Sequence, residues 1–278
     1  MRPATLAASV APVLTGTAIA VQQGGVRLGA GIGALVVGVA LQLGVNFAND
    51  YSDFVRGADA ARVGPLRAAS SGVVAPEQVR WAAIGAFGAA GAAGLLLSLA
   101  VDVRLLAVGA ACLLAGWLYT GGPRPYGYLG LGEVFVFLFF GLVATAGTVY
   151  VESGRVTALA VLMACAMGLL ATAILVLNNL RDIDTDEAAG KRTLATRIGR
   201  TRTRWLLAAL VGGAFAIPVV VSFSMPAVLI SLLAVPIGWS AVSIAFASTH
   251  APSLVTALKR MAIAELVYAL LFTLATLL

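Results

Sequence analysis

The chain has few charged residues and almost none of the soft metal ligands. Charged residues make up 11% of its 278 positions, and the sequence contains one histidine and two cysteines. Soluble domains carry about 25% charged residues, so this composition argues against one. Cys112 and Cys165 lie inside apolar segments without CxxC spacing. We therefore expect both thiols to be packing residues rather than members of a disulfide framework or a metal site.

Apolar residues are abundant instead. They make up 60% of the chain, and the mean hydropathy is +0.99. Apolar runs long enough for a helix to cross a hydrocarbon layer of ~30 Å recur along the whole length. Frequent glycine and alanine suit close helix packing in a membrane. We predict an all-α polytopic membrane protein, a single domain over residues 1–278, with nine spans at residues 4–22, 29–48, 81–101, 105–121, 129–151, 156–178, 205–223, 226–248 and 261–278.

The basic residues lie unevenly on the two sides of this predicted bundle. We expect the first span to be retained rather than removed as a signal peptide, because Ser, Thr and Pro interrupt its apolar stretch. With nine spans, 15 of the 18 Lys and Arg residues then lie on the side of the N-terminus, and only Arg27, Arg104 and Arg155 lie on the other. Such an excess marks the cytoplasmic side and attracts anionic lipid head groups. We expect membrane lipids, and no nucleic acid, as partners of this face.

Seven of the 12 acidic residues form two clusters on that same side. The first cluster follows the second span and the second follows the sixth, and their members are Asp50, Asp53, Asp59, Asp182, Asp184, Asp186 and Glu187. An isolated acidic helix end is usually solvated, and carboxylates oppose the dipole of a helix C-terminus. The repetition of this unfavourable placement at matching depth on two helices favours a bound cation over two solvated ends.

Each cluster forms a helical stripe together with neighbouring amides. Residues at i, i+3, i+4 and i+7 share a helix face, and the residues in question are Asn46, Asn49, Asp50 and Asp53 in the first stripe and Asn178, Asp182 and Asp186 in the second. Oxygen donors without histidine or cysteine favour Mg²⁺, with Mn²⁺ as an alternative. Since Mg²⁺ usually binds one or two carboxylates together with substrate phosphates, two facing stripes would hold a Mg²⁺-bound diphosphate.

Basic residues near the clusters are candidates for binding that diphosphate. Lys191 and Arg192 follow Gly190 in a short loop after the second cluster, where an ammonium group and a guanidinium group can meet phosphate oxygens. Arg67 follows the first cluster and is a further candidate. The remaining arginines of this side fit anchoring at the lipid surface.

An aromatic segment on the same side supplies candidates for binding an organic substrate. The turn "YTGGPRPYGY" contains Tyr119, Arg124 and Tyr126, although interfacial tyrosines are also common in membrane proteins. The run from Phe135 to Phe140 fits either helix packing or a substrate tunnel, and the sequence does not separate the two.

These segments resemble the UbiA superfamily of intramembrane prenyltransferases, and most of all its branch that prenylates 1,4-dihydroxy-2-naphthoate. The first motif of that branch, N-D-Y-x-D-x-x-x-G-x-D, is matched from Asn49 to Asp59. The second motif, D-x-x-x-D followed by G-K-x-T-L, is matched from Asp182 to Leu194. The opening "RPATLAASVAPVLTG" and the "YTGGPRPYGYLGLGE" segment are also similar to that branch.

The resemblance implies a bundle of nine helices around a central cavity, in a bacterial cell membrane, with an active site that faces the cytoplasm. It implies Mg²⁺-dependent transfer of a polyprenyl group from its diphosphate to 1,4-dihydroxy-2-naphthoate, with decarboxylation, in menaquinone biosynthesis. The expected catalytic residues are Asp50, Asp53, Asp182 and Asp186, and Asn49 and Asp59 join them as metal ligands. The expected substrate-binding residues are Asn46, Asn49, Asn178, Lys191, Arg192, Arg67, Tyr119, Arg124 and Tyr126.

Three alternatives stay open at the level of the sequence. A UbiA-type enzyme could use another aromatic acceptor, such as 4-hydroxybenzoate or homogentisate. A secondary transporter could use the acidic clusters as cation sites, although such sites usually lie near the membrane midplane between inverted repeats. A structural or assembly protein would have no need for paired acidic clusters.

Overall fold

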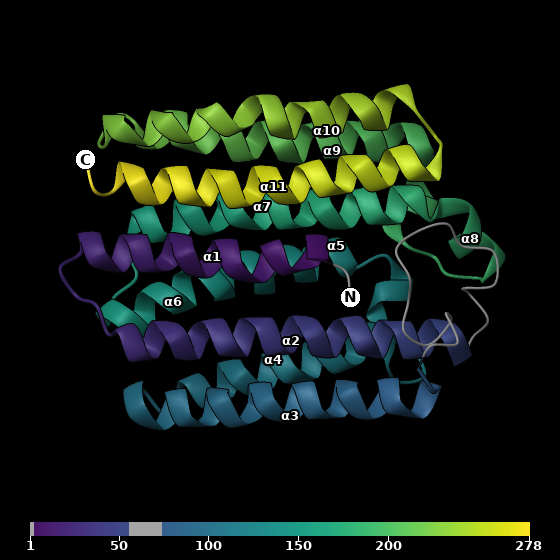
Figure 1. Ribbon diagram of the computed structural model, residues 1–278, viewed down its shortest axis with the longest axis horizontal. Helices are drawn as coiled ribbons and strands as arrows, with labels where there is room; N and C mark the ends of the chain where they lie inside the picture. The colour runs from purple at the N-terminus through teal and green to yellow at the C-terminus, as the bar shows by residue number, and fades with distance from the viewer. Residues whose placement is uncertain (1–2, 56–73) are drawn as a thin grey trace.

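The computed structural model describes residues 3–55 and 74–278, and its helices lie side by side along one long axis (Figure 1). The described residues contain no strand. The chain begins with four long helices, α1 (Pro3–Gln22), α2 (Leu28–Val55), α3 (Pro76–Val101) and α4 (Leu105–Thr120). The C-terminal end of α2 lies at the same end of the bundle as α8, which follows α7 (Figure 1).

A composite rod follows α4. After the 3₁₀ turn η1 (Tyr126–Leu129), it consists of α5 (Gly132–Val136), the π-helix η2 (Phe137–Val143) and α6 (Ala144–Ser153). A Cβ atom on Gly141 would come within 2.3 Å of the Gly168 Cα atom, so this glycine lets η2 approach the next helix backbone to backbone. Single π-helical turns of this kind often occur at functional sites because they change the faces that side chains occupy.

The second half of the chain supplies the remaining helices. They are α7 (Ala158–Arg181), α8 (Ile183–Ala188), α9 (Leu194–Val221), the 3₁₀ helix η3 (Pro226–Ala234) that continues into α10 (Val235–Ala247), and α11 (Ala251–Ala275). Threonine hydroxyl groups cap two of these helices: Thr157 accepts from the backbone amide of Ala160 in α7, and Thr193 accepts from that of Thr196 in α9.

Helix α7 is the centre of the bundle. About 67% of its most apolar window is buried, against 22% for α2 and 17% for α3. The outer helices instead expose large apolar side chains such as Trp81 (66%) and Leu96 (69%), as lipid-facing surfaces do. Within the described residues, seven helical segments are long and apolar enough to cross a membrane. The protein is an integral membrane protein.

The nine predicted spans correspond in order to nine helical rods of the described chain, but α4, with 16 residues, and α11 are not among the seven segments that are long and apolar enough to cross a membrane. The boundaries differ on the side of the acidic clusters. Helix α3 begins at residue 76 rather than 81, α9 at 194 rather than 205, and α11 at 251 rather than 261. Pro at the first helical turn or a Thr cap begins these helices. Hydropathy detects only the part of each helix that lies in the hydrocarbon layer, so it misses these first turns.

Candidate active site at the acidic ends of α2 and α7

The last turns of α2 hold Asp50 and Asp53 of the first acidic cluster inside the protein. Helix α2 continues unbroken to Val55, so the predicted stripe forms. Asp50 is 7% exposed and Asp53 is 1% exposed. The Asn46 side chain donates to the Thr5 hydroxyl of α1 at 2.9 Å, which joins α2 to α1 at this depth. Buried carboxylates at a helix C-terminus need a compensating cation.

The end of α7 supplies such a cation to Asp182. The Arg181 guanidinium group donates to both carboxylate oxygens of Asp182, at 2.7 Å from Nε and 2.6 Å from Nη2. Its Nη2 atom also donates to Asn178 Oδ1 at 2.8 Å. Both side chains of this ion pair are buried. The helix stops at Asp182, so the second predicted stripe is divided and Asp186 lies on α8.

Lys191 joins the two acidic ends. Its ammonium group donates to Asp53 Oδ1 and lies 3.8 Å from Asp186 Oδ1. The Tyr128 hydroxyl donates to the same Asp53 oxygen at 3.1 Å, and the Tyr128 ring lies 4.7 Å from the ammonium nitrogen. Burial alone would lower the pKa of Lys191, but the attraction of Asp53, followed by Tyr128 and Asp186, raises it above its ordinary value. The lysine is therefore a charged bridge between α2 and α8.

The loop between α8 and α9 has the backbone geometry that this bridge requires. Gly190 has φ +71°, in the left-handed region that favours glycine, and turns the chain after α8. The Lys191 amide then donates to the Asp186 carbonyl at 2.8 Å, and the Arg192 amide donates to the Tyr128 carbonyl at 3.2 Å. The loop is thus held against both α8 and η1, which fixes where the lysine side chain begins.

A cavity of about 440 Å³ extends from this polar end into the bundle. Its polar end is lined by Asn46, Asn49, Asp53, Asn178, Asp182, Asp186 and Lys191. Farther in, the walls come from α2, α3, α4 and α6 and consist of apolar side chains such as Val37, Leu97, Leu113 and Val151. The cavity therefore joins a charged site to a space suited to a hydrocarbon chain.

Aromatic rings form one wall of the cavity. Tyr126 stacks on Phe135 with ring centroids 4.0 Å apart and an interplanar angle of 23°, and Phe135 continues to Phe139 at 6.0 Å. Tyr119 meets the edge of Tyr126 at 5.5 Å. All four rings line the cavity. Both interpretations of the phenylalanine run thus apply: Phe135, Phe139 and Phe140 line the cavity, and Phe137 packs against Gly168 of α7.

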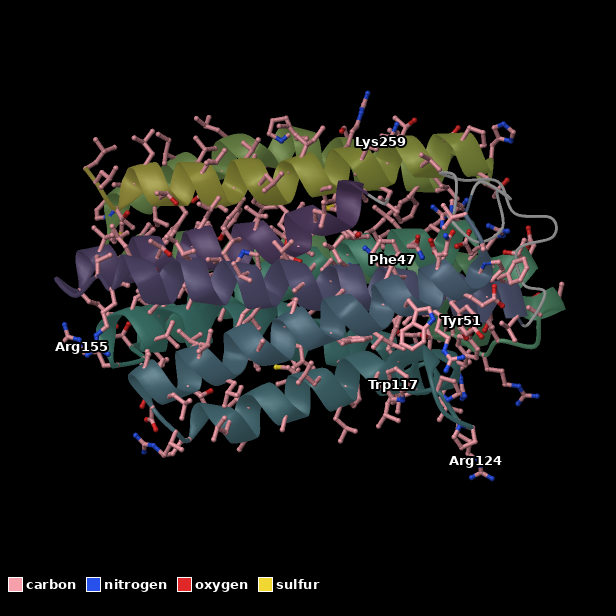
Figure 2. All side chains as sticks on the ribbon, turned by 60° about the horizontal axis from the view of Figure 1, so that its bottom comes forward. Phe47, Tyr51, Trp117, Arg124, Arg155 and Lys259 are labelled. Carbon is pink, nitrogen blue, oxygen red and sulfur yellow. The ribbon has the colours of Figure 1, made fainter. Side chains whose placement is uncertain are left out.

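Several predicted site residues lie elsewhere. Arg124 and Arg192 are exposed and do not line the cavity, and Figure 2 shows Arg124 pointing away from the bundle. Asp50 is buried but is not part of the cavity wall. Asp59 and Arg67 lie outside the residues that the structure describes.

Four residues at the site were not among the sequence-based candidates. Arg181 pairs with Asp182, and Tyr128 contacts Asp53 and Lys191, as described above. Asn179 lines the cavity and donates to the carboxylate of buried Glu133 at 3.0 Å. The sequence did contain a signal for Arg181 and Asn179, because "NNLRD" places two amides and a cation directly before an acid at a helix end. Nothing in the sequence pairs Glu133 with α7.

The donor set at the polar end fits a divalent cation of the Mg²⁺ type. In the described part of the chain, no three His, Cys, Asp or Glu side chains gather as a metal-binding group. Asp53 on α2 and Asp186 on α8 nevertheless face the Lys191 ammonium group from two sides, so a position for a cation exists between them. Asn49 and Asp182 line the same end of the cavity. Carboxylate and amide oxygens are the donors that Mg²⁺ prefers.

Comparison with known proteins points in the same direction. The model of the UbiA prenyltransferase family matches residues 9–277. A 1,4-dihydroxy-2-naphthoate octaprenyltransferase from Mycobacterium tuberculosis is 42% identical over 269 residues, which cover 97% of this chain and 92% of the relative. A protein of the same name from Escherichia coli is 39% identical over 220 residues, covering 77% and 71% of the two chains.

Solved structures share the fold at low sequence identity. The apo structure of a UbiA homolog from Aeropyrum pernix superimposes with a TM-score of 0.71 at 15% identity, over 99% of this chain and 98% of that one. A UbiA homolog from Archaeoglobus fulgidus, solved with GPP and Mg²⁺ bound, gives a TM-score of 0.66 at 13% identity over 100% and 98% of the two chains. The arrangement of helices is therefore that of the UbiA fold.

Proposed function

Because this chain belongs to the UbiA prenyltransferase family, we propose that it transfers a polyprenyl group from a polyprenyl diphosphate to 1,4-dihydroxy-2-naphthoate. The reaction forms a carbon–carbon bond between the allylic carbon and the naphthoate ring and releases diphosphate and CO₂. Its product is demethylmenaquinol, an intermediate of menaquinone biosynthesis. The high identity to relatives named for this reaction over nearly the whole chain supports the choice of acceptor.

One structural observation carries this proposal: Asp53 of α2 and Asp186 of α8 face each other across the ammonium group of Lys191, at the polar end of an otherwise apolar cavity. A prenyl diphosphate has the matching shape, with a polyanionic head and a hydrocarbon tail. Its head would lie at the charged end, and its tail would extend between α2, α3, α4 and α6.

Asp53 and Asp186, with Asn49 and Asp182 beside them, would hold Mg²⁺ at this end. When bound, the ion neutralises the diphosphate oxygens and so stabilises the charge that develops on the leaving group. Lys191 would help to stabilise the same negative charge. Its ammonium group can turn from the carboxylates to the diphosphate oxygens once other positive charge has taken its place.

The cavity walls protect the allylic carbon from water after the diphosphate has left. Departure of the diphosphate leaves positive charge on the allylic carbon, which water would capture in an open site. The apolar and aromatic lining, including Tyr126 and Phe135, excludes water and keeps the allylic carbon next to the acceptor ring. Electron-rich rings at the wall also stabilise a nearby cation.

The same proposal includes the membrane and the side that the site faces. Relatives of this name occur in bacteria, which supports the bacterial plasma membrane. The described basic residues support a cytoplasmic site, since most of them belong to the loops and helix ends near the acidic clusters, whereas Arg155 lies at the opposite end from Arg124 (Figure 2).

The test is turnover by the purified protein in detergent or proteoliposomes. With Mg²⁺, a polyprenyl diphosphate and dihydroxynaphthoate, mass spectrometry should detect demethylmenaquinol together with an equal amount of diphosphate. Chelation of the metal should stop both, and Mn²⁺ should restore part of the rate. Higher kcat/KM with 4-hydroxybenzoate or homogentisate would assign a different acceptor. Absence of diphosphate release with every acceptor would refute the proposal.

A further inference from the structure

Two consecutive asparagines of α7 line the cavity with their amides held in opposite ways. The oxygen of Asn178 accepts from Arg181 at 2.8 Å. The nitrogen of Asn179 instead donates to Glu133 Oε1 at 3.0 Å. The helix therefore offers the cavity a hydrogen-bond donor from Asn178 and a hydrogen-bond acceptor from Asn179.

The acceptor oxygen of Asn179 is available to a ligand. No hydrogen bond reaches its Oδ1 atom within the described residues, and this atom is not among the fully buried polar atoms that lack a partner. It therefore borders open space, and Asn179 borders the cavity. The Asn179 amide nitrogen donates to Glu133, and an ionised carboxylate there offers acceptors only, which would keep the nitrogen on the side of Glu133 and the oxygen toward the cavity.

The position of Asn179 matches the depth at which the two substrates meet. It lies three residues before Asp182 on the same helix, about 4.5 Å farther from the acidic end. With the diphosphate at the acids, the allylic carbon extends into the cavity at about this level. The acceptor ring has to approach that carbon, so its polar groups come near Asn179.

The neighbouring wall suits a flat aromatic ring. Glu133, which orients Asn179, lies in the first turn of the helix that carries Phe135, and Phe135 stacks with Tyr126 at the cavity wall. The hydroxyl of Tyr126 donates to the Ala115 carbonyl at 2.9 Å, which fixes that ring. Offset stacking on such a wall would hold a bicyclic ring in one plane.

We infer that Asn179, oriented by Glu133, accepts a hydrogen bond from a phenolic hydroxyl of the acceptor and selects for hydroxylated aromatic acceptors. Asn179 is then a specificity-determining residue and Glu133 a positioning residue. The inference rests on the proposed function, because it places the acceptor beside the diphosphate site. An acceptor hydroxyl also releases electron density into the ring when it donates a hydrogen bond, which favours attack on the allylic carbon.

Three variants test this arrangement through the KM values of the two substrates. Asn179→Leu removes the accepting oxygen, Glu133→Leu removes the group that orients it, and Glu133→Gln retains an oxygen that can accept from Asn179. We expect the first two to raise the acceptor KM about tenfold, as for the loss of one hydrogen bond. Glu133→Gln should stay within about threefold of the wild type. The KM for the prenyl diphosphate should stay within about threefold in all variants.

The control is Gln23→Leu, which removes another hydrogen-bonded amide in the loop between α1 and α2. It should leave the acceptor KM unchanged. An acceptor KM that is unchanged in both Asn179→Leu and Glu133→Leu would overturn the inference. Equal rises in the KM values of both substrates would also overturn it, because they would place Asn179 in the diphosphate site.

A comparison of substrates on the wild-type protein adds a test that does not depend on the folding of any variant. The two monomethyl ethers of the acceptor each lack one donating hydroxyl, and for wild-type protein one of them should bind about tenfold more weakly than the parent in a competition assay. For Asn179→Leu this difference should disappear. Equal binding of the parent and both ethers by an active wild-type enzyme would refute the inference alone. Absence of turnover with the parent acceptor would refute the proposed function instead.

Discussion

Lys191 donates a hydrogen bond to Asp53 across the gap between two helix ends, and the same ammonium group lies 3.8 Å from Asp186. Two buried carboxylates that repel each other are therefore held by one internal cation. A divalent ion and a diphosphate entering this place bring both a stronger counter-charge for the acids and a new partner for the lysine. The first two predictions below depend on this exchange.

Replacement of Lys191 by methionine should affect stability and activity together. In Lys191→Met, Asp53 and Asp186 face each other without the bridge, so the thermal unfolding midpoint in metal-free buffer should fall. Added Mg²⁺ should raise the midpoint more in this variant than in the wild type, and kcat/KM for the prenyl diphosphate should fall at least tenfold. Lys259→Met is the control, since Lys259 is exposed on α11 (Figure 2). Equal responses of both variants to Mg²⁺ would contradict the bridge.

Asp53→Asn and Asp186→Asn should abolish Mg²⁺-dependent turnover while the protein stays folded in detergent. Each change removes one of the two charges that face the cation position, and we expect a loss of about 10³-fold or more in kcat. Asp184→Asn is a matched control on α8, because the Asp184 side chain is 81% exposed and pairs with Arg200 outside the cavity. Full activity in either cavity variant would show that the metal lies elsewhere.

The buried pair of Arg181 and Asp182 predicts a non-additive effect on stability. Arg181→Met leaves a buried carboxylate without its cation, which typically costs about 3–5 kcal/mol. The double variant Arg181→Met/Asp182→Leu should be less destabilised than the single variant, because no unpaired charge remains. Chemical unfolding in mixed detergent would measure both free energies. Additive losses in the double variant would contradict a tightly coupled pair.

Glu265 predicts a gain of stability. Its side chain is fully buried in α11, and neither carboxylate oxygen has a hydrogen-bond partner within the described residues. Replacement of such a group by an apolar side chain of similar size removes a cost of about 1–3 kcal/mol. Glu265→Leu should therefore unfold at a higher temperature with turnover retained. A stabilised but inactive variant would reveal a catalytic use of this carboxylate.

The sequence predicted the arrangement of helices because hydropathy and charge each report on a strong constraint. Apolar runs located the rods, and the parity of the spans placed both acidic clusters at one end, where the structure brings Asp53 and Asp186 together. Each prediction depends on a property that can be read from one segment at a time. The first is the length of an apolar run, and the second is the number of basic residues in the loops beside it.

The partners within the site were harder to predict, because they depend on contacts between distant segments. Lys191 was expected to meet phosphate, but its bond to Asp53 crosses 138 positions of sequence. The pairing of Asn179 with Glu133 depends on how α5 packs on α7, which no local pattern encodes. The π-helical turn that brings Phe139 and Phe140 to the cavity is also a consequence of packing rather than of hydropathy.

The most direct test is a density map of the protein with Mg²⁺ and a non-hydrolysable prenyl thiodiphosphate. We predict metal density between Asp53 and Asp186, the diphosphate beside it, the Lys191 ammonium group turned from Asp53 to a phosphate oxygen, and the hydrocarbon chain along α2, α3 and α4. Metal bound away from these two carboxylates, or a diphosphate outside the cavity with Lys191 still on Asp53, would contradict the account.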